Sequence, residues 1–193
     1  MKLFTVTTLL GALAIPASAT IFSYDANLSG PNESPPNASP GNGLAFVNYD
    51  DSAHTLQVEV TFSGLTAGTT ASHIHAATAV AGTGTAGVAT TTPTFAGFPL
   101  GVTSGSYSNT LDLTLSSSYN PSYITANGGT TASAEVALAA AIAADKAYLN
   151  IHTTAFPGGE IRGFLVPVPE PSSAAFLTVG GIGAWAIRRR KTV

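Results

Sequence analysis

The sequence contains no cysteine and almost no cations outside its two ends. Without disulfides, an exported domain must rely on its packed core, on a bound metal, or on both. Between residues 20 and 167, only Lys146 and Arg162 are basic, against nine acidic residues. This segment therefore has a net charge of −7 and no basic patch, which argues against binding to nucleic acid.

The N-terminal end has the pattern of a secretory signal. Met1 and Lys2 form a short positive region, an apolar run follows from Leu3 to Ile15, and Ala17-Ser18-Ala19 is an A-x-A cleavage motif. We therefore predict a signal peptide of residues 1–19, cut by signal peptidase after Ala19.

The C-terminal end has three parts. Val168-Pro169-Glu170-Pro171 precedes an apolar run over 174–187, which four cations close: Arg188, Arg189, Arg190 and Lys191. As a helix this run is about 21 Å long, and the flanking serines and snorkelling arginines extend it enough to span a bilayer. The cations should keep the last residues in the cytoplasm.

This three-part end resembles the PEP-CTERM sorting signal of Gram-negative bacteria, here over residues 168–193, with Pro169, Glu170 and Pro171 as its core. The resemblance implies export across the inner membrane, transient anchoring through 174–187 and cleavage by an exosortase near the motif. It further implies a final place at the cell surface or in the extracellular matrix, with exopolysaccharide or matrix components as partners.

The segment between the two signals is predicted to be mainly β. In 55–62 strict alternation puts Leu56, Val58, Val60 and Phe62 on one face, and 44–49 should pair with it in a hairpin. Further strands are expected over 21–28, 72–76, 105–115, 147–153 and 160–166, an exposed Pro-rich loop over 31–43, and a loop with one short strand over 82–101.

Two short helices are expected, over 120–125 and over 133–144, the second capped by Thr131 or Ser133. Many short strands with Gly and Pro turns favour one antiparallel domain, a Greek-key β-sandwich or barrel with the helices in crossovers. The two apolar signal segments would flank this domain.

Three of the four histidines form a candidate metal site. His73 and His75 flank Ile74 in a predicted strand, so both imidazoles should lie on one face. His152, on a later strand, shares a face with Asn150. Three imidazoles suit Zn(II) or Cu(II). His54 follows a polar turn and is expected to be solvated.

The pair His73 and His75, together with the run from Tyr148 to Gly163, resembles the CHRD domain, a module found in chordin and in bacterial exported proteins. The resemblance covers most of 21–166. It implies an exported domain without an assigned biochemical activity.

Two interpretations of the polar cluster follow. The favoured one is a structural network in which Arg162 pairs with Glu160, or with a nearby Asp, beside Asn150 and the histidines. This network would belong to a non-enzymatic binding or structural module. The alternative is a zinc or copper site. Acid-base catalysis by Glu160 beside a histidine stays open, although no nucleophile motif accompanies it. So does carbohydrate binding through Tyr107, Tyr119 and Tyr123.

Overall fold

A computed structural model describes residues 20–169 of the chain. The strands are β1 (Ile21–Ser29), β2 (Asn42–Asp50), β3 (Thr55–Ser63), β4 (Thr69–His75), β5 (Gly105–Asp112), β6 (Tyr148–Thr153), β7 (Ile161–Phe164) and β8 (Val166–Pro167). The helices are α1 (Pro121–Ala126) and α2 (Thr131–Ala143), with 3-10 turns η1 (Gly30–Asn32) and η2 (Ser116–Ser118). The predicted fold class, mainly antiparallel β with two short helices in a crossover, is confirmed.

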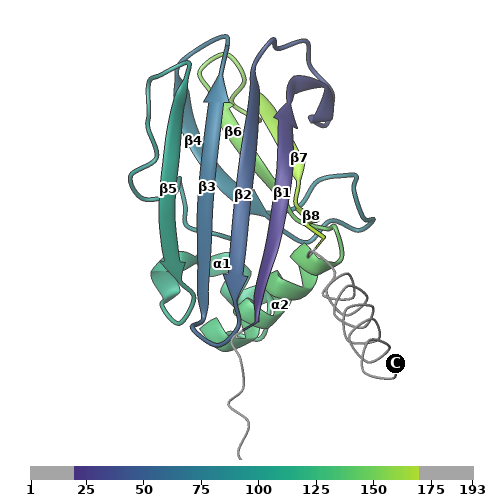
Figure 1. The fold of residues 1–193 in the computed structure, drawn as a ribbon, viewed down its shortest axis with the longest axis vertical. Coiled ribbons are helices and arrows are strands. Elements are labelled where there is room, and N and C mark those ends of the chain that lie inside the picture. Colours follow the sequence, from purple (N-terminus) through teal and green to yellow (C-terminus); the bar gives the residue numbers. More distant parts are fainter. Residues whose placement is uncertain (1–19, 170–193) are drawn as a thin grey trace, which may run out of the picture.

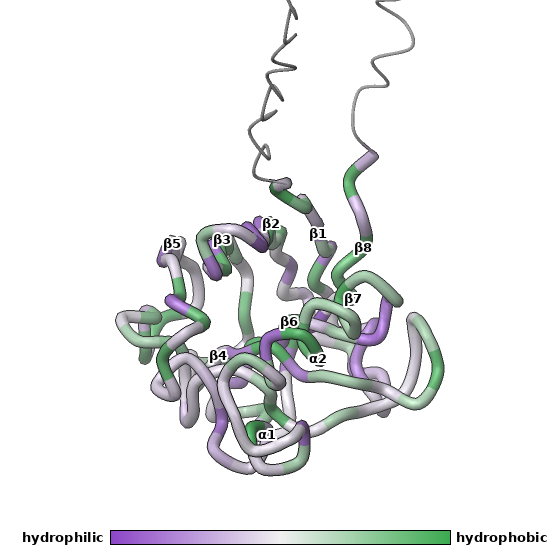
Figure 2. Tube along the Cα trace, turned by 90° about the horizontal axis from the view of Figure 1, so that it is seen from below, coloured by the Kyte–Doolittle hydropathy of each residue, from purple (hydrophilic) through white to green (hydrophobic). Residues whose placement is uncertain are grey.

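All strands belong to one antiparallel sheet in the order β4-β6-β7-β1-β2-β3-β5, with β8 added beside β1. The sheet curls into a half-barrel, so that β4, β6 and β7 lie behind β5, β3, β2 and β1 (Figure 1). Seen along the strands, the two layers enclose the interior (Figure 2), and both helices lie at one end of the strands (Figure 1). Both helices lie between β5 and β6 in the chain and form the crossover between the layers.

The core follows from strand alternation. Leu56, Val58, Val60 and Phe62 of β3 are all buried, as predicted, and β3 pairs along its whole length with β2. In the rear layer, Ile74 and Leu149 are register partners and are fully buried. Strands β4 and β6 thus each bury one face in the core, which leaves the opposite face free for polar side chains.

Several predicted boundaries are wrong. The strand expected over 105–115 ends at Asp112, the one expected over 160–166 is divided into β7 and β8, and 82–101 forms only isolated bridges. The cap of α2 is Thr130, whose hydroxyl accepts from the Ser133 N–H. In return the Ser133 hydroxyl accepts from the Thr130 N–H, which completes a capping box.

The Pro-rich loop over 31–43 is less exposed than expected, because two of its side chains are buried. Glu33 lies beside β6 and β7, and Ser39 donates a 2.6 Å hydrogen bond to the Glu160 carboxylate. Glu160 also accepts from the Thr66 backbone N–H and from the Thr153 hydroxyl, each at 2.6 Å. This one buried carboxylate therefore joins three separate segments of the chain.

No helix among residues 20–169 is long and apolar enough to cross a bilayer. The predicted signal peptide with Ala19, and the sorting-signal residues from Glu170 onward, lie outside the described residues. Those include Pro171, the apolar run 174–187 and the four cations Arg188, Arg189, Arg190 and Lys191.

The Glu160 junction yields a stability prediction. Burial alone would raise the pKa of this carboxyl, but the hydrogen bonds it accepts outweigh burial and lower the pKa. Glu160→Gln should reduce the free energy of unfolding by about 1 to 2 kcal/mol, because charge-assisted bonds become neutral ones. Urea denaturation at pH 7 measures this change.

The matched control is Glu59→Gln, since Glu59 is exposed on β3 and should change stability by no more than about 0.5 kcal/mol. In the wild type the Glu160 contribution should be lost as pH falls through its lowered pKa, since the carboxyl then takes up a proton. Equal effects of the two substitutions would contradict the role given to Glu160.

Candidate metal centre

Two neighbouring strands of the rear layer carry the three histidines. His73 and His75 lie on β4 and His152 lies on β6. The antiparallel register pairs His73 with Asn150, His75 with Tyr148, and Ala71 with His152. Register partners point to the same face of a sheet, so all three imidazoles lie on the face opposite Ile74.

Each imidazole is held by a backbone carbonyl at its Nδ1 atom. His73 Nδ1 lies 3.2 Å from the Pro93 oxygen, His75 Nδ1 2.8 Å from the Ala86 oxygen, and His152 Nδ1 2.8 Å from the Pro157 oxygen. A carbonyl can only accept, so each Nδ1 carries the proton and donates it. In a neutral ring the Nε2 atom is then left with a lone pair.

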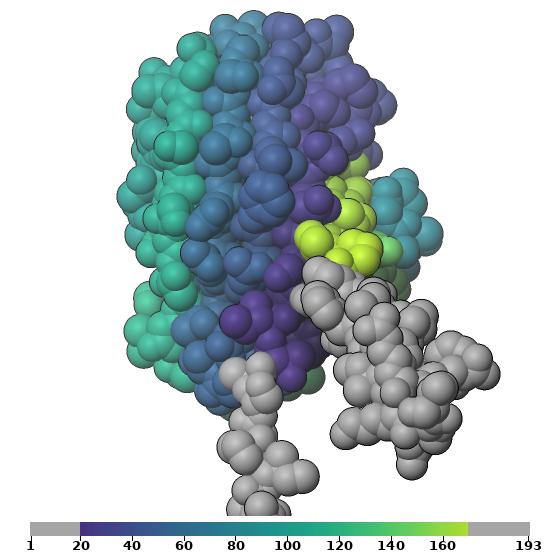
Figure 3. All heavy atoms as spheres, viewed as in Figure 1, coloured from purple at the N-terminus to yellow at the C-terminus, as the bar shows by residue number. Residues whose placement is uncertain are grey.

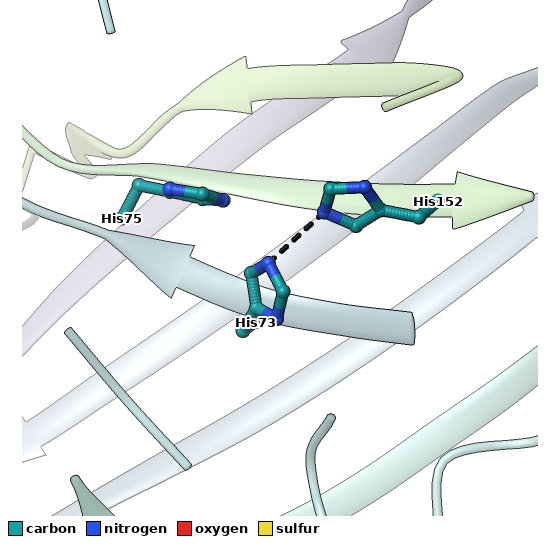
Figure 4. A group of neighbouring side chains, drawn as sticks. All are labelled: His73, His75 and His152. Carbon is teal, nitrogen blue, oxygen red and sulfur yellow. Dashed lines mark hydrogen bonds between the residues drawn. The ribbon is translucent and has the colours of Figure 1, made fainter. Parts of the chain in front are cut away.

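The three Nε2 atoms turn toward one another (Figure 4). His73 Nε2 and His152 Nε2 are 2.9 Å apart, and the buried His75 Nε2 has no hydrogen-bond partner. One potential ligand atom from each ring lies within 4.8 Å of the other two. Two nitrogens on one Zn(II) are about 3.4 Å apart in tetrahedral geometry, so small ring movements would bring all three onto one ion.

The pKa values keep these rings neutral. Burial, followed by the neighbouring His75 and His152, lowers the pKa of His73 to about 3. Burial also lowers the pKa of His75, to about 4, and that of His152. With the proton of each neutral ring at Nδ1, the facing Nε2 atoms of His73 and His152 both present lone pairs. Two lone pairs 2.9 Å apart repel unless a proton or a metal cation is shared between them.

A second layer fixes the orientation of His75. Its ring stacks on Tyr148 with centroids 4.7 Å apart and planes 7° apart. The Arg162 guanidinium carbon lies 4.6 Å from the centre of the same tyrosine ring. A tyrosine sandwiched between a cation and an imidazole restricts the rotation of His75.

The predicted ion pair between Glu160 and Arg162 is wrong. Arg162 instead faces Glu33, with Nε 3.8 Å from Oε2, and donates to the backbone oxygens of Asn32 and Gly84. Glu160 bonds the Ser39, Thr66 and Thr153 donors on the other side of β7. The sequence offered one signal for Glu33: it is the single acidic residue of the Pro-rich loop.

Asn150 links this pair to the histidine strands. Its amide donates a 2.7 Å hydrogen bond to Glu33 Oε1, and its own oxygen is buried without a partner. Burial raises the pKa of Glu33 to about 7, against the opposing effect of Arg162. Gly159, at φ 131°, must be glycine, because a Cβ there would collide with the Asn150 amide and the Glu33 carboxylate.

Two other predicted features have different surroundings. His54 is solvated as predicted, with 52% of its side chain exposed, but its Nδ1 also lies 3.0 Å from the buried Glu135 carboxylate, which raises the pKa of His54. Tyr107, Tyr119 and Tyr123 are all buried, so none of them offers an exposed aromatic surface for a sugar ring.

Comparison with known proteins agrees with this architecture. The family model described as CHRD domain matches residues 24–165, and the model described as PEP-CTERM protein-sorting motif matches residues 167–191. No curated protein and no solved structure matches the chain.

The lowered histidine pKa values predict acid sensitivity in metal-free protein. The unfolded chain takes up these protons near pH 6.5, whereas the folded rings resist them until well below pH 5. The free energy of unfolding should therefore fall as pH drops below 6.5, by up to about 1.4 kcal/mol per pH unit from the buried His73. His73→Gln should flatten this loss in denaturant titrations between pH 5 and 7.

His54→Gln is the matched control with the opposite sign. Because Glu135 raises the pKa of His54, protonating His54 stabilises the fold below pH 6.5, and that contribution is lost as pH rises through the raised pKa. Its removal should steepen the acid loss rather than flatten it. If both variants change the slope in the same direction, the assignment is wrong.

Proposed function

The chain belongs to the CHRD domain family, and from that premise we propose that its domain is a non-enzymatic module that binds one transition-metal ion through His73, His75 and His152. The sorting motif marks the chain as an exported protein that exosortase processes at the membrane. The proposed module acts after export, at the cell surface or in the matrix.

One observation carries this proposal: three backbone carbonyls fix the protons of three imidazoles at Nδ1 and aim three Nε2 lone pairs at a common space. Metal-binding histidines in proteins commonly use this second layer of hydrogen bonds to set ring orientation and tautomer. Three such bonds around one space support a ligand set arranged in advance of the ion.

The donor set favours Zn(II) or Cu(II). The chain has no cysteine, and its one methionine is Met1, so sulfur ligands that select Cu(I) do not reach this space. Three imidazoles leave a further coordination position for water or an exogenous ligand. His75 and His152 are only partly buried, which supports access for such a ligand from solvent.

A purely structural network is the competing explanation, and it accounts for different residues. Glu33 accepts from Asn150 and forms an ion pair with Arg162, which itself donates to backbone oxygens. None of these contacts uses a histidine side chain. Structural bonding on this face therefore leaves the three Nε2 atoms unexplained, and one of them is buried without a partner. An ion supplies the missing partner for all three.

Calorimetric titration of the chelator-treated protein with Zn(II) and with Cu(II) tests the proposal. We expect one ion per chain. The double variant His73→Ala and His75→Ala, and the single variant His152→Ala, should each weaken binding by more than about 100-fold, since removing only an outer-shell partner already costs 10- to 100-fold.

His54→Ala is the control, because it removes a histidine that lies outside the cluster and should leave affinity unchanged. Circular dichroism of each variant separates lost binding from lost folding. X-ray absorption of the bound ion should show three nitrogen ligands at about 2.0 Å. Equal affinity in wild type and double variant would exclude this site.

A further inference from the structure

An apolar groove lies at the end of the domain where β1 begins and β2 ends. Its cavity of about 350 Å³ is lined by Phe22, Tyr24, Tyr49, Val136, Ala140 and Ala143, among others, and Asp51 is its one charged lining residue. Phe22 is 40% exposed although it continues the core-facing series of β1, and its ring stacks against Tyr49.

Helix α2 forms one wall of this groove and has no polar outer face. Its exposed positions include Ala132, Val136, Ala140 and Ala143, and Val136 is 71% exposed. Its one charged residue, Glu135, points inward and is buried. Helices on a protein surface normally present charged residues to water. The apolar outer face of α2 is therefore suited to contact with another apolar surface.

The chain leaves the domain at this same end. Strand β8 runs antiparallel to β1, Pro167 pairs with Tyr24, and the Val168 N–H donates a 2.9 Å bond to the Ser23 oxygen (Figure 1). The described chain ends at Pro169, and the predicted membrane run begins at Ala174. Five residues span at most about 18 Å, so an anchored precursor cannot hold this end far from the bilayer.

We propose that this groove rests on the outer surface of the inner membrane while the precursor is anchored, with Phe22 and Val136 entering the lipid interface. This proposal is independent of metal binding. Strand β8, yellow in Figure 3, lies beside β1 and places the end of the described chain next to the strand that lines the groove. Because the tether is short, the groove has a high effective concentration at the bilayer surface. A small apolar contact is then enough to hold the groove against the lipid.

The occupant is a zwitterionic lipid surface rather than an anionic one. Asp25 lies on β1 and Asp51 lines the groove. Residues 20–169 contain only two cations, Lys146 and Arg162, so an anionic surface would be repelled. The groove is also far too small for the 14-residue apolar run itself, which argues against intramolecular docking.

Fluorescence quenching in proteoliposomes tests the contact. The full chain, with its one tryptophan removed by Trp185→Phe, would carry Val136→Trp in zwitterionic vesicles whose acyl chains are brominated. The control is Leu100→Trp, since Leu100 is 52% exposed and precedes Gly101, which bonds Thr69 at the opposite end of the sheet. We expect bromolipid to quench the Val136→Trp emission at least about twofold more than the control.

A second pair of variants guards against a local effect of the probe. Ala140→Trp should be quenched as Val136→Trp is, and adding Val136→Asp should reduce that quenching while circular dichroism stays unchanged. Equal quenching at positions 100 and 136 would overturn the proposal. The proposal would also be overturned if the tryptophan emission were shielded from water equally with and without bromolipid and if chains could be cross-linked to each other. A second copy of the chain would then cover the groove.

Discussion

The pairing of β4 with β6 is the constraint on which the site depends. It joins segments about 80 residues apart in sequence and fixes their register, with His73 opposite Asn150 and His75 opposite Tyr148. Because side chains alternate strictly along a strand, a slip by one residue would send the imidazoles into the core and Ile74 out of it. The buried pair of Ile74 and Leu149 therefore determines where the histidines point, although neither residue carries any chemistry.

Around that strand pair, the polar residues divide into two groups with different roles. Glu33, Asn150 and Arg162 connect the Pro-rich loop to the sheet through one hydrogen bond, one ion pair and the bonds of Arg162 to backbone oxygens. Each histidine contacts one backbone carbonyl through its Nδ1 atom. At the inner Nε2 atoms, His73 and His152 contact only each other and His75 has no partner. Because Tyr148 touches both His75 and Arg162, the two groups share one packed boundary and position each other.

Much of this could be predicted from local patterns. Alternation in β3 and the His73-Ile74-His75 pattern identify faces, because a strand's period depends on few neighbours. The partner of Arg162 could not be predicted in this way, since Glu33 reaches it from a loop about 130 residues earlier that has no period. The same reason hid the contact of His54 with Glu135, which depends on how α2 lies against the β2–β3 turn. The three Nδ1 bonds also escaped prediction, because they end on backbone oxygens, which every residue has.

The short strand β8 has a consequence for the fate of the processed protein. Residues 166–168 are hydrogen-bonded beside β1, and the sorting motif starts within them. Cleavage at the motif would leave a product whose new carboxyl terminus lies within a few residues of the pairing with β1. Such an end would present carboxypeptidases with only a short unpaired segment, so the pairing of β8 with β1 would limit trimming of the processed protein.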